Sequence, residues 1–271
     1  MSMIFFNAAQ RDLARRLLER ALAFNSQTTP TDALPLRIAG RRAGLLLPHA
    51  VEQIRNCSLA NLFRFGQGVV DFVPKSSVDE ALSLVARTFH DAGFFFQWRN
   101  ELLDIVDASD DTPFAAAERG LFRYFGLATR CVYAVGFTQD GRLFLCQRSF
   151  AKQVDPGLWD VLAAGLVSQG ETPEQALVRE IHEEAGLTPV DFQPSGRWHR
   201  FAVRRLVEEG WMHEDAFCMP VYVKNEKAVH NLDGEVCSVQ CVPVDAALER
   251  IEANLVPWDT SVALLSTLLE P

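Results

Sequence analysis

The sequence predicts an α/β protein made of two domains, and two observations carry this prediction. From Arg130 onward, alternating apolar runs follow one another, and the dipeptide Asp140-Gly141 between the first two is a strong hairpin signal. Before that point, amphipathic helical stretches are interspersed with single short strands. We therefore expect a small α+β domain at residues 1–126, with no flexible linker after it, and an α/β domain at residues 127–271.

The elements of the N-terminal domain are predicted from periodicity and turn residues. An amphipathic helix is expected at 8–24, where leucines share one side and arginines the other. After it we expect, in order, a hairpin in LRIAGRRAGLLLP, a helix at 49–54, a strand at 69–73, a helix at 78–90 and a strand at 102–106. Thr112 can cap a helix and Pro113 suits its first turn, so a further helix is expected through AAAERGLFRYF. The aromatic stretch at 89–98 is expected to be buried.

The second domain is predicted to be rich in strands, with helices after them. The first hairpin joins CVYAVGFT to RLFLCQRS. Further strands are expected near 161–165, 198–203, 216–223 and 236–242, and final helices at 245–252 and 260–269.

Charge is distributed unevenly over the 271 residues, whose formal net charge is −9. Up to residue 128 there are 14 basic and 14 acidic residues, so the remaining 12 basic and 21 acidic residues carry the whole −9. We therefore expect no nucleic-acid partner, because a phosphate backbone requires a basic surface. If the acidic half binds an anionic substrate, a cation must lie between them.

Composition and cysteine usage favour a globular protein of a reducing compartment. Hydrophobic residues make up 48% of the chain, and no apolar run approaches the roughly 18 residues that suggest a membrane span. No signal segment is recognised, so the cytoplasm is expected and no membrane partner. The six cysteines are sparse, and Cys237 and Cys241 lack a second pair at zinc-finger spacing, so we expect buried thiols.

A helix with clear ends is expected at 173–185. Thr172 is a natural N-cap, Pro173 fits the first helical position, Gln175 completes a capping box and Gly186 supplies the C-terminal stop. At 100° per residue, the apolar side chains share one arc of this helix. The neighbouring arc carries three glutamates.

The acidic arc consists of Glu180, Glu183 and Glu184. Glu180 repels both other glutamates at roughly 0.2 to 0.5 kcal/mol per pair, so a positive partner is expected. Oxygen ligands in this number suit a hard divalent cation, Mg²⁺ or Mn²⁺. Arg179 is expected to hold Glu183 or Glu171 and fix its orientation.

A solvated acidic face is the alternative interpretation, and the surrounding pattern argues against it. Fixed positions of G-x5-E-x7-R-E-U-x-E-E-x-G-U, with U apolar, are filled by Gly165, Glu171, Arg179, Glu180, Ile181, Glu183, Glu184, Gly186 and Leu187. Its seven fixed residue types would match by chance in roughly one of a million such chains.

This segment resembles the Nudix box and departs from it at no fixed position. The resemblance implies an α/β/α sandwich with a mixed sheet, and Mg²⁺-dependent hydrolysis of a diphosphate linked to a further group X. It also implies metal ligands at Glu180, Glu183 and Glu184, often joined by the carbonyl of Gly165.

A carboxylate must accept the proton of the attacking water, and the sequence offers more than one. Glu183 or Glu184 could do so. Many Nudix enzymes use a glutamate on a later loop, for which Glu235 in NLDGEV is the best candidate, although Asp-Gly-Glu is also an ordinary turn.

The residues just before the box offer substrate contacts. Arg148 and Lys152 could hold the terminal phosphate and Trp159 could stack on a ring. Each also has an ordinary structural role, as surface charge for the two cations and as a core aromatic for the tryptophan.

Stretches outside the box resemble a two-domain Nudix group related to enzymes that hydrolyse thiamine diphosphate and its oxidised analogues. These stretches are RGLFRYFGL, QRSFAKQVDPGLWD and NLDGEV, and that group also carries a small N-terminal domain. The resemblance implies thiamine diphosphate or an oxidised analogue as substrate. Nucleotide substrates, such as ADP-ribose or oxidised nucleoside triphosphates, are the alternative.

Two other function classes share the fold. The stretch QRS…K…PG.WD also resembles isopentenyl-diphosphate isomerase, which relies on a cysteine in the strand before the box-like helix. Here that strand reads VLAAG, and Cys146 lies one strand earlier. A ligand sensor without catalysis would tend to lose box carboxylates, whereas this chain keeps all of them. A homodimer is compatible with the sequence.

Overall fold

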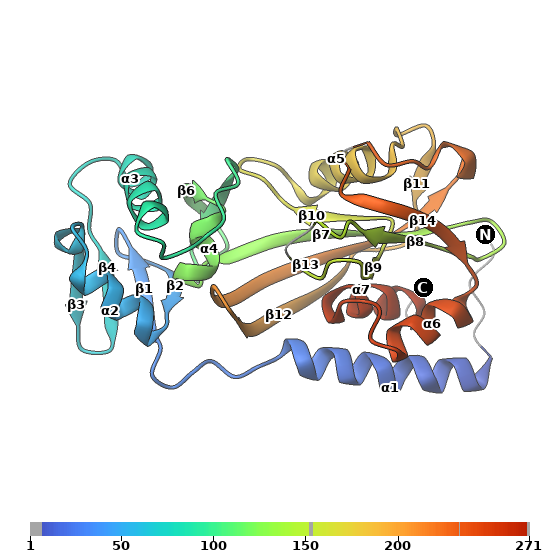
Figure 1. Cartoon of the computed structure of the whole chain (residues 1–271), viewed down its shortest axis with the longest axis horizontal. Coiled ribbons are helices and arrows are strands. Elements are labelled where there is room, and N and C mark those ends of the chain that lie inside the picture. The colour runs from blue at the N-terminus through green and yellow to red at the C-terminus, as the bar shows by residue number, and fades with distance from the viewer. Residues whose placement is uncertain (1–6, 152–153, 233, 270–271) are drawn as a thin grey trace.

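The computed structural model describes residues 7–151, 154–232 and 234–269, and its larger domain, the sheet domain, is built on one mixed sheet (Figure 1). The strand order is β11-β13-β7-β8-β14, and β10, β12 and β9 pair with β7, β13 and β8. The strands are β7 (Ala128–Phe137), β8 (Leu143–Arg148), β9 (Trp159–Asp160), β10 (Ala163–Leu166), β11 (Phe192–Pro194), β12 (His199–Val207), β13 (Gly210–Val223) and β14 (Val236–Val242). Strands β7 and β13 run parallel and the other pairs antiparallel.

Helices cover both faces of this sheet, as Figure 1 shows. Helix α5 (Pro173–Ala185) lies on one face, where Leu177 and Ile181 pack against Val132 of β7. On the other face lie α1 (Ala8–Asn25), α6 (Val244–Glu252) and α7 (Trp258–Leu269). Alternating side chains of a strand point to opposite faces, so β7 contributes to both cores. The predicted α/β/α sandwich is confirmed.

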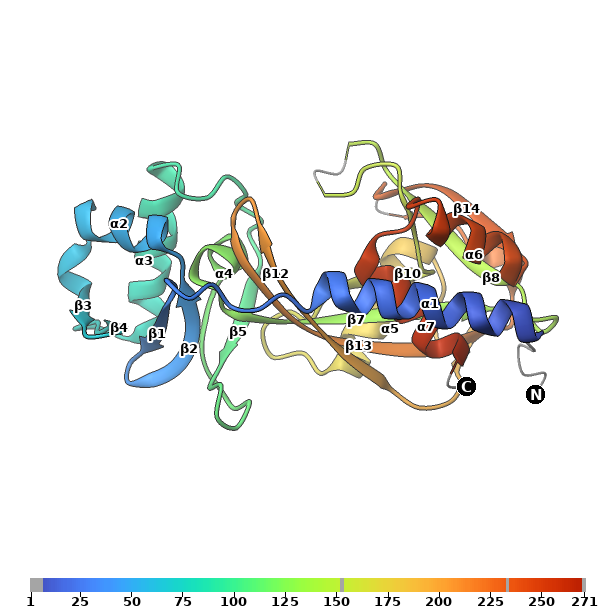
Figure 2. The same cartoon turned by 90° about the horizontal axis from the view of Figure 1, so that it is seen from below.

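Helix α1 packs on the sheet domain although it opens the chain (Figure 2). Leu17 is buried in the same core as Leu264 of α7, and the guanidinium of Arg20 lies 4.6 Å from the ring centroid of Trp258. The chain therefore begins on the sheet domain, crosses to the N-terminal domain and returns. Periodicity identified the amphipathic helix but could not show which domain covers its apolar side.

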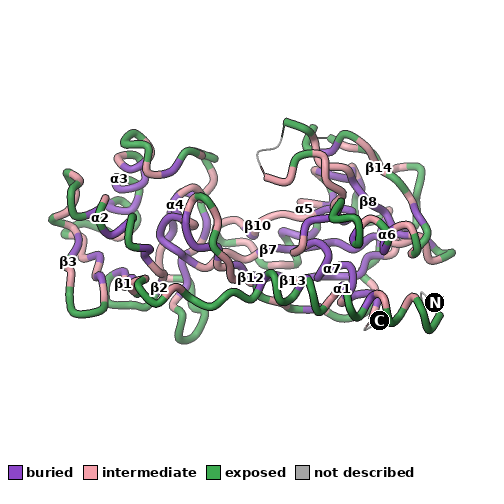
Figure 3. Tube along the Cα trace, turned by 60° about the horizontal axis from the view of Figure 1, so that its bottom comes forward, coloured by how far each residue is buried: buried purple, intermediate pink, exposed green. Residues whose placement is uncertain are grey.

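The N-terminal domain has its own sheet, of order β2-β1-β4-β3, and its own core. Its elements are β1 (Leu34–Ile38), β2 (Arg41–Leu46), α2 (Pro48–Asn56), the 3₁₀ turn η1 (Ala60–Leu62), β3 (Phe63–Gly66), β4 (Val69–Phe72), α3 (Val78–Asp91), β5 (Leu102–Val106), β6 (Pro113–Glu118) and α4 (Gly120–Phe125). Figure 3 shows buried backbone inside each domain and an exposed outer side on α1. Phe89 and Phe95 are buried in this domain's own core, whereas Phe96 is 75% exposed.

One predicted helix is wrong at its start. Residues 113–118 form strand β6, which pairs antiparallel with β5, and only the short α4 follows as helix. Ile105 of β5 pairs with Ala115, so β6 supplies hydrogen-bonding partners along that edge. Pairing in the folded protein therefore overrides the helical preference of the alanines, and Pro113 takes the first strand position, where its missing N–H is tolerated.

The two domains meet where the hairpin of β12 and β13 reaches α4 (Figure 2). Arg123 of α4 donates to Glu209 in the hairpin turn at 2.9 Å. A side chain on Gly210 would overlap the carbonyl of Arg123, so glycine permits this close approach. Among the described residues, no helix is both long and apolar enough to cross a membrane.

Candidate metal and diphosphate site

Helix α5 is fixed at both ends by the predicted caps. The hydroxyl of Thr172 accepts the Gln175 N–H at 3.3 Å, and the Gln175 side chain accepts the Thr172 N–H at 2.8 Å. At the other end, Gly186 adopts the left-handed conformation with φ 66°. The helix that carries the acidic side chains is therefore fixed at both ends. The loop before it, residues 166–171, is called the box loop below.

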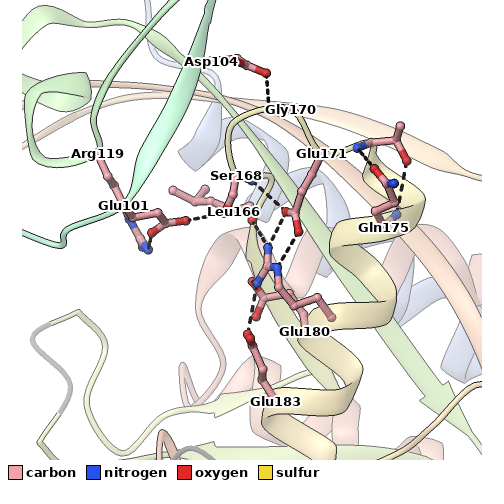
Figure 4. A network of polar contacts seen from close by, with 12 residues as sticks. Glu101, Asp104, Arg119, Leu166, Ser168, Gly170, Glu171, Gln175, Glu180 and Glu183 are labelled. Atoms are coloured by element: carbon pink, nitrogen blue, oxygen red, sulfur yellow. Dashed lines mark hydrogen bonds and ion pairs between the residues drawn. The ribbon is translucent and has the colours of Figure 1, made fainter.

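Arg179 is the positive partner that the acidic face requires. Its partners Glu171, Glu180 and Glu183 are labelled in Figure 4. Its Nε and Nη2 donate to the two carboxylate oxygens of Glu171, each at 2.8 Å, and Nη2 also reaches the Leu166 carbonyl at 2.9 Å. Its Nη1 donates to Glu180 at 2.6 Å and to Glu183 at 3.1 Å. Hydrogen bonding to Arg179 lowers the pKa of Glu171. Arg179 thus joins the box loop to two of the three glutamates.

Glu180 lies against the backbone of β10. Its side chain is 12% exposed, and a Cβ atom on Gly165 would overlap its carboxylate. Burial raises the pKa of Glu180, and the charge of Arg179 opposes that rise. The glycine of the box is therefore required here to make room for the glutamate.

Glu183 and Glu184 have different surroundings although they are adjacent on the helix. The side chain of Glu183 is 45% exposed and lines a cavity. Glu184 is 7% exposed and accepts the backbone N–H of Ala164 in β10 at 2.9 Å. Glu183 thus faces the solvent-accessible side of the site, whereas Glu184 is buried against β10 and lies outside the cavity lining.

The donors fit a hard divalent cation in their chemistry. Three carboxylates lie on one helix, with Glu180 beside Gly165 of β10 and Glu184 on the Ala164 N–H, and oxygen ligands are the ones that Mg²⁺ and Mn²⁺ prefer. Within the described ranges, no three His, Cys, Asp or Glu side chains converge as a ready cluster. Here the guanidinium of Arg179 neutralises oxygens of Glu180 and Glu183 instead.

A cavity of about 800 Å³ opens in front of these glutamates, between the two domains. This is large enough for a small-molecule substrate. The box contributes Gly165, Arg179, Glu180 and Glu183 to its lining. The N-terminal domain contributes polar and charged side chains, namely Gln97, Arg99, Glu101, Arg119 and Arg123. The site therefore has walls from both domains.

Another part of the lining is a pair of acids, the buried Glu214 and the half-buried Asp259, that sequence reasoning missed. The Tyr133 hydroxyl lies 3.3 Å from both Glu214 and Asp259, and Thr129 donates to Glu214 at 3.4 Å. Burial, followed by the charge of Asp259, raises the pKa of Glu214 to about 7. Burial also raises the pKa of Asp259. The signal in the sequence that could have identified these two acids is that both lie next to long apolar stretches.

Arg148 lines the cavity but is already engaged. It donates to Asp160 at 2.8 Å and to the carbonyl of Val154 at 3.1 Å, and its side chain is 20% exposed. Burial lowers its pKa, but Asp160 and the other nearby acids together raise it by more. These contacts hold its guanidinium in one place beside the cavity.

The other predicted substrate and base residues are placed differently. Lys152 lies outside the described residues. Trp159 is outside the cavity lining, and its ring lies 4.0 Å beneath the guanidinium of Arg250. Glu235 is exposed and lines the cavity, and its backbone carbonyl accepts the Ser149 N–H at 2.8 Å. Glu183 and Glu235, both named as candidate bases, therefore border the same space.

Comparison with known proteins identifies the family. The NUDIX domain model matches residues 127–261. The curated relative "Nudix hydrolase 24, chloroplastic" of Arabidopsis thaliana is 29% identical over 167 residues, which cover 60% of this chain and 46% of that protein. An isopentenyl-diphosphate Delta-isomerase of Salmonella arizonae is 30% identical over 158 residues, covering 58% and 82%. A solved MutT protein from Methanosarcina mazei Go1 has a TM-score of 0.42 and 21% identity, covering 52% and 92%.

The chain belongs to the Nudix family. It spans about half the length of the first plant relatives that it matches. Those two relatives are named chloroplastic, so the cytoplasmic location expected from the sequence stays a prediction. None of the relatives named here carries thiamine in its name.

Proposed function

We propose that the protein hydrolyses a diphosphate bond with the help of Mg²⁺ or Mn²⁺. The observation that carries the proposal is the arrangement of Glu180 and Glu183 around Arg179, beside Gly165, at the edge of a substrate-sized cavity. Glu180, Glu183 and Glu184 would hold the metal, with the carbonyl of Gly165 as a further donor. Bound there, the metal would neutralise phosphate charge and lower the pKa of an attacking water.

The reaction requires a water oxygen to bond to phosphorus while the bridging P–O bond breaks. The chain's own residues orient the reactants: Arg179 fixes the glutamates, and Arg148, held by Asp160, offers positive charge to the departing phosphate. The water proton passes to a carboxylate. Glu183 and Glu235 are both exposed to the cavity and remain the two candidates for that role.

For the group X we propose thiamine, or an oxidised form of it, so that the substrate is the corresponding diphosphate. Support comes from the sequence resemblance and from the acids of the cavity. Glu214 and Asp259 lie in the lining away from the box, where carboxyl groups can accept hydrogen bonds from an amino-substituted ring and attract a cationic one. Such acids would repel a further phosphate, which argues against nucleoside triphosphates.

Isomerisation of isopentenyl diphosphate is the second candidate, because several relatives about 30% identical are isomerases of that name. The residue chemistry gives it less support. Strand β10 contains no cysteine, and Cys146 on β8 is 1% exposed, with its sulfur 3.4 Å from the Leu162 carbonyl. Among the described cavity residues the thiol is that of Cys131, whose pKa burial raises well above its ordinary value.

The test is a panel of substrates with Mg²⁺: thiamine diphosphate, oxythiamine diphosphate, ADP-ribose and isopentenyl diphosphate. We expect phosphate release from the first two, with kcat/KM at least about tenfold above ADP-ribose, the ratio that roughly 1.4 kcal/mol of selective binding would give. Preference for ADP-ribose would overturn the thiamine assignment. Conversion of isopentenyl diphosphate to its isomer without phosphate release would overturn hydrolysis.

A second test addresses the metal ligands. Glu184→Gln keeps the shape of the side chain and an oxygen for the Ala164 N–H, but removes the charge. We expect activity to fall by roughly 100-fold or more, with a higher Mg²⁺ requirement. Glu174→Gln, on the first turn of the same helix, is the matched control and should behave as the unmodified protein. Near-normal turnover of Glu184→Gln would refute the metal assignment.

A further inference from the structure

Arg119 of the N-terminal domain has a backbone held firmly at the edge of the cavity. It lies between β6 and α4, and its N–H donates to the Glu101 carbonyl at 2.9 Å. The following Gly120 packs so closely on the Gln97 carbonyl and the Phe95 ring that a side chain there would overlap both. A residue fixed in this way can present its side chain with little further ordering.

Glu101 connects the Arg119 side chain to the box loop (Figure 4). One of its carboxylate oxygens accepts from Arg119 Nη1 at 2.8 Å, and the other accepts from the Ser168 hydroxyl at 3.0 Å. The Ser168 backbone N–H in turn donates to Glu171, the carboxylate that Arg179 holds. A continuous chain of polar contacts therefore runs from the N-terminal domain to the glutamates of α5.

Strand β5 strengthens this junction with two further hydrogen bonds to the box loop. The Gln169 N–H donates to the Leu102 carbonyl at 2.8 Å, and the Gly170 N–H donates to the Asp104 carboxylate at 2.9 Å. The relative position of Arg119 and the box is thus set by several contacts that flank Glu101. A single exposed ion pair would not fix it.

Arg119 and Glu101 line the same cavity as Glu180 and Glu214, and electrostatic effects agree with this placement. The charge of Glu101, its partner, is close enough to contribute to the raised pKa of Glu180. The charge of Arg119 itself is close enough to lower the pKa of Glu214, against the larger effect of burial. A diphosphate bound beside the box glutamates would therefore share this cavity with the Arg119 guanidinium.

Arg119 also has the most available guanidinium among the ion-paired arginines of the described cavity lining. Its side chain is 40% exposed, compared with 33% for Arg123, 29% for Arg179 and 20% for Arg148. One Glu101 oxygen accepts one of its N–H groups, and a guanidinium carries five. Donors are therefore available to a phosphate without breaking the Glu101 contact.

We propose that Arg119 binds the diphosphate of the substrate and that Glu101 positions it, so that the N-terminal domain supplies part of the substrate site. This inference rests on the proposed diphosphate chemistry and extends it to a residue outside the Nudix domain match, 127–261. Arg119 supplies positive charge where the lining is otherwise rich in acids. Its planar donors can contact two phosphate oxygens together.

The test compares Arg119→Ala, Arg119→Lys and Glu101→Gln with the control Arg87→Ala, which removes an exposed arginine of α3 outside the cavity lining. For each full-length variant, kcat and KM are measured on thiamine diphosphate with Mg²⁺. Binding of methylenediphosphonate with Mg²⁺, a diphosphate mimic that cannot be hydrolysed at its bridge, is measured by calorimetry. Thermal unfolding establishes that each variant folds.

For Arg119→Ala we expect KM, and the Kd of methylenediphosphonate, to rise about 10- to 100-fold, which is the loss of charge-assisted hydrogen bonds, while kcat changes less. Arg119→Lys should recover part of the binding. Glu101→Gln keeps an oxygen for Ser168 but weakens the hold on Arg119, so a smaller rise in KM of about 3- to 10-fold is expected.

The outcomes separate this inference from the proposed function. If hydrolysis is observed and Arg119→Ala binds the diphosphonate as Arg87→Ala does, the inference fails and the function stands. If the unmodified protein hydrolyses nothing in the panel but binds the diphosphonate in a manner that Arg119→Ala abolishes, the function fails and the binding role stands. A larger effect from Arg99→Ala than from Arg119→Ala would move the role to that neighbouring arginine and overturn the proposal.

Discussion

Arg179 and Glu171 form a two-point ion pair, in which Nε and Nη2 of the guanidinium donate to the two carboxylate oxygens at 2.8 Å each. The third nitrogen, Nη1, remains for Glu180 and Glu183. Two nitrogens of the arginine thus donate to the box loop, and one donates to the acidic face. This division explains why the box needs a planar guanidinium rather than a point charge.

Replacing Arg179 by lysine should therefore impair the site even though the charge is kept. An ammonium group cannot contact both Glu171 oxygens and both helix glutamates from one position. We expect kcat/KM to fall about 10- to 100-fold and the Mg²⁺ concentration for half-maximal rate to rise, as for other residues that orient metal ligands. A Mg²⁺ titration of the initial rate measures both, and an unchanged half-maximal concentration would contradict the role.

Gly165→Ala should disable the site by displacing Glu180. The added methyl group would overlap the carboxylate, and backbone pairing with Val132 of β7 leaves the strand little freedom to move away. We expect activity to fall by roughly 100-fold, as for a misplaced catalytic group. Thermal unfolding should still show a cooperative transition.

The control for Gly165→Ala is Gly170→Ala, in the loop that follows β10. A Cβ atom there meets nothing within 4 Å, but φ is +74°, which strains any side chain. This variant should lose about 1 kcal/mol of stability and keep most of its activity. Equal activity losses in the two variants would show that loop strain, and not overlap with Glu180, causes the effect.

Glu214 should make stability depend on pH. Its pKa is about 7 in the folded protein against an ordinary 4.5, so the folded state binds this proton more tightly. The stabilisation of the folded state by this proton is fully present below about pH 4.5 and is lost as the pH rises to about 7. Two and a half pKa units correspond to at most about 3 to 4 kcal/mol.

Comparison with Glu214→Gln isolates this effect from that of His213. The pKa of His213 is lowered to about 4, so its titration makes the folded state more stable as the pH rises. Urea unfolding at pH 5 and pH 8 gives the free energy of unfolding of both proteins. Relative to Glu214→Gln, the unmodified protein should lose about 1 to 3 kcal/mol between these pH values. The same difference between the proteins at both pH values would show that Glu214 titrates normally.

The sequence was sufficient to predict the structure of the box, because each feature of the box depends on residues that are close together in the chain. Caps, turn glycine and acidic arc all lie within one helix and its flanks, and the structure places Thr172, Gln175 and Gly186 in the expected capping contacts. The mixed sheet and the layers followed from the family resemblance and are confirmed.

Features set by long-range packing could not be predicted. The strand β6 depends on its partner β5, and the placement of α1 depends on α7, which is more than 230 residues away in the chain. The acids Glu214 and Asp259 join only when β13 and α7 meet, and Arg119 reaches the site only through the hairpin of β5 and β6. The contacts themselves have no signal in a single sequence, which shows only that both acids lie next to long apolar stretches.

The identity of the general base can be decided between Glu183 and Glu235 by separating proton transfer from metal binding. Both side chains border the cavity, but Glu183 belongs to the acidic face of α5 and is held by Arg179, whereas Glu235 precedes β14. Loss of a base should lower kcat by about 100- to 10,000-fold at an unchanged Mg²⁺ requirement. Loss of a metal ligand should raise that requirement.

We therefore predict that Glu235→Gln lowers kcat and removes the acid limb of the pH–rate profile, while the Mg²⁺ concentration for half-maximal rate stays the same. Glu183→Gln should raise that concentration, because its carboxylate lies with Glu180 around Arg179. Initial rates over a grid of pH and Mg²⁺ measure both quantities. The reverse pattern, with the pH limb lost in Glu183→Gln, would assign proton transfer to the helix and leave Glu235 as a residue of the β14 turn.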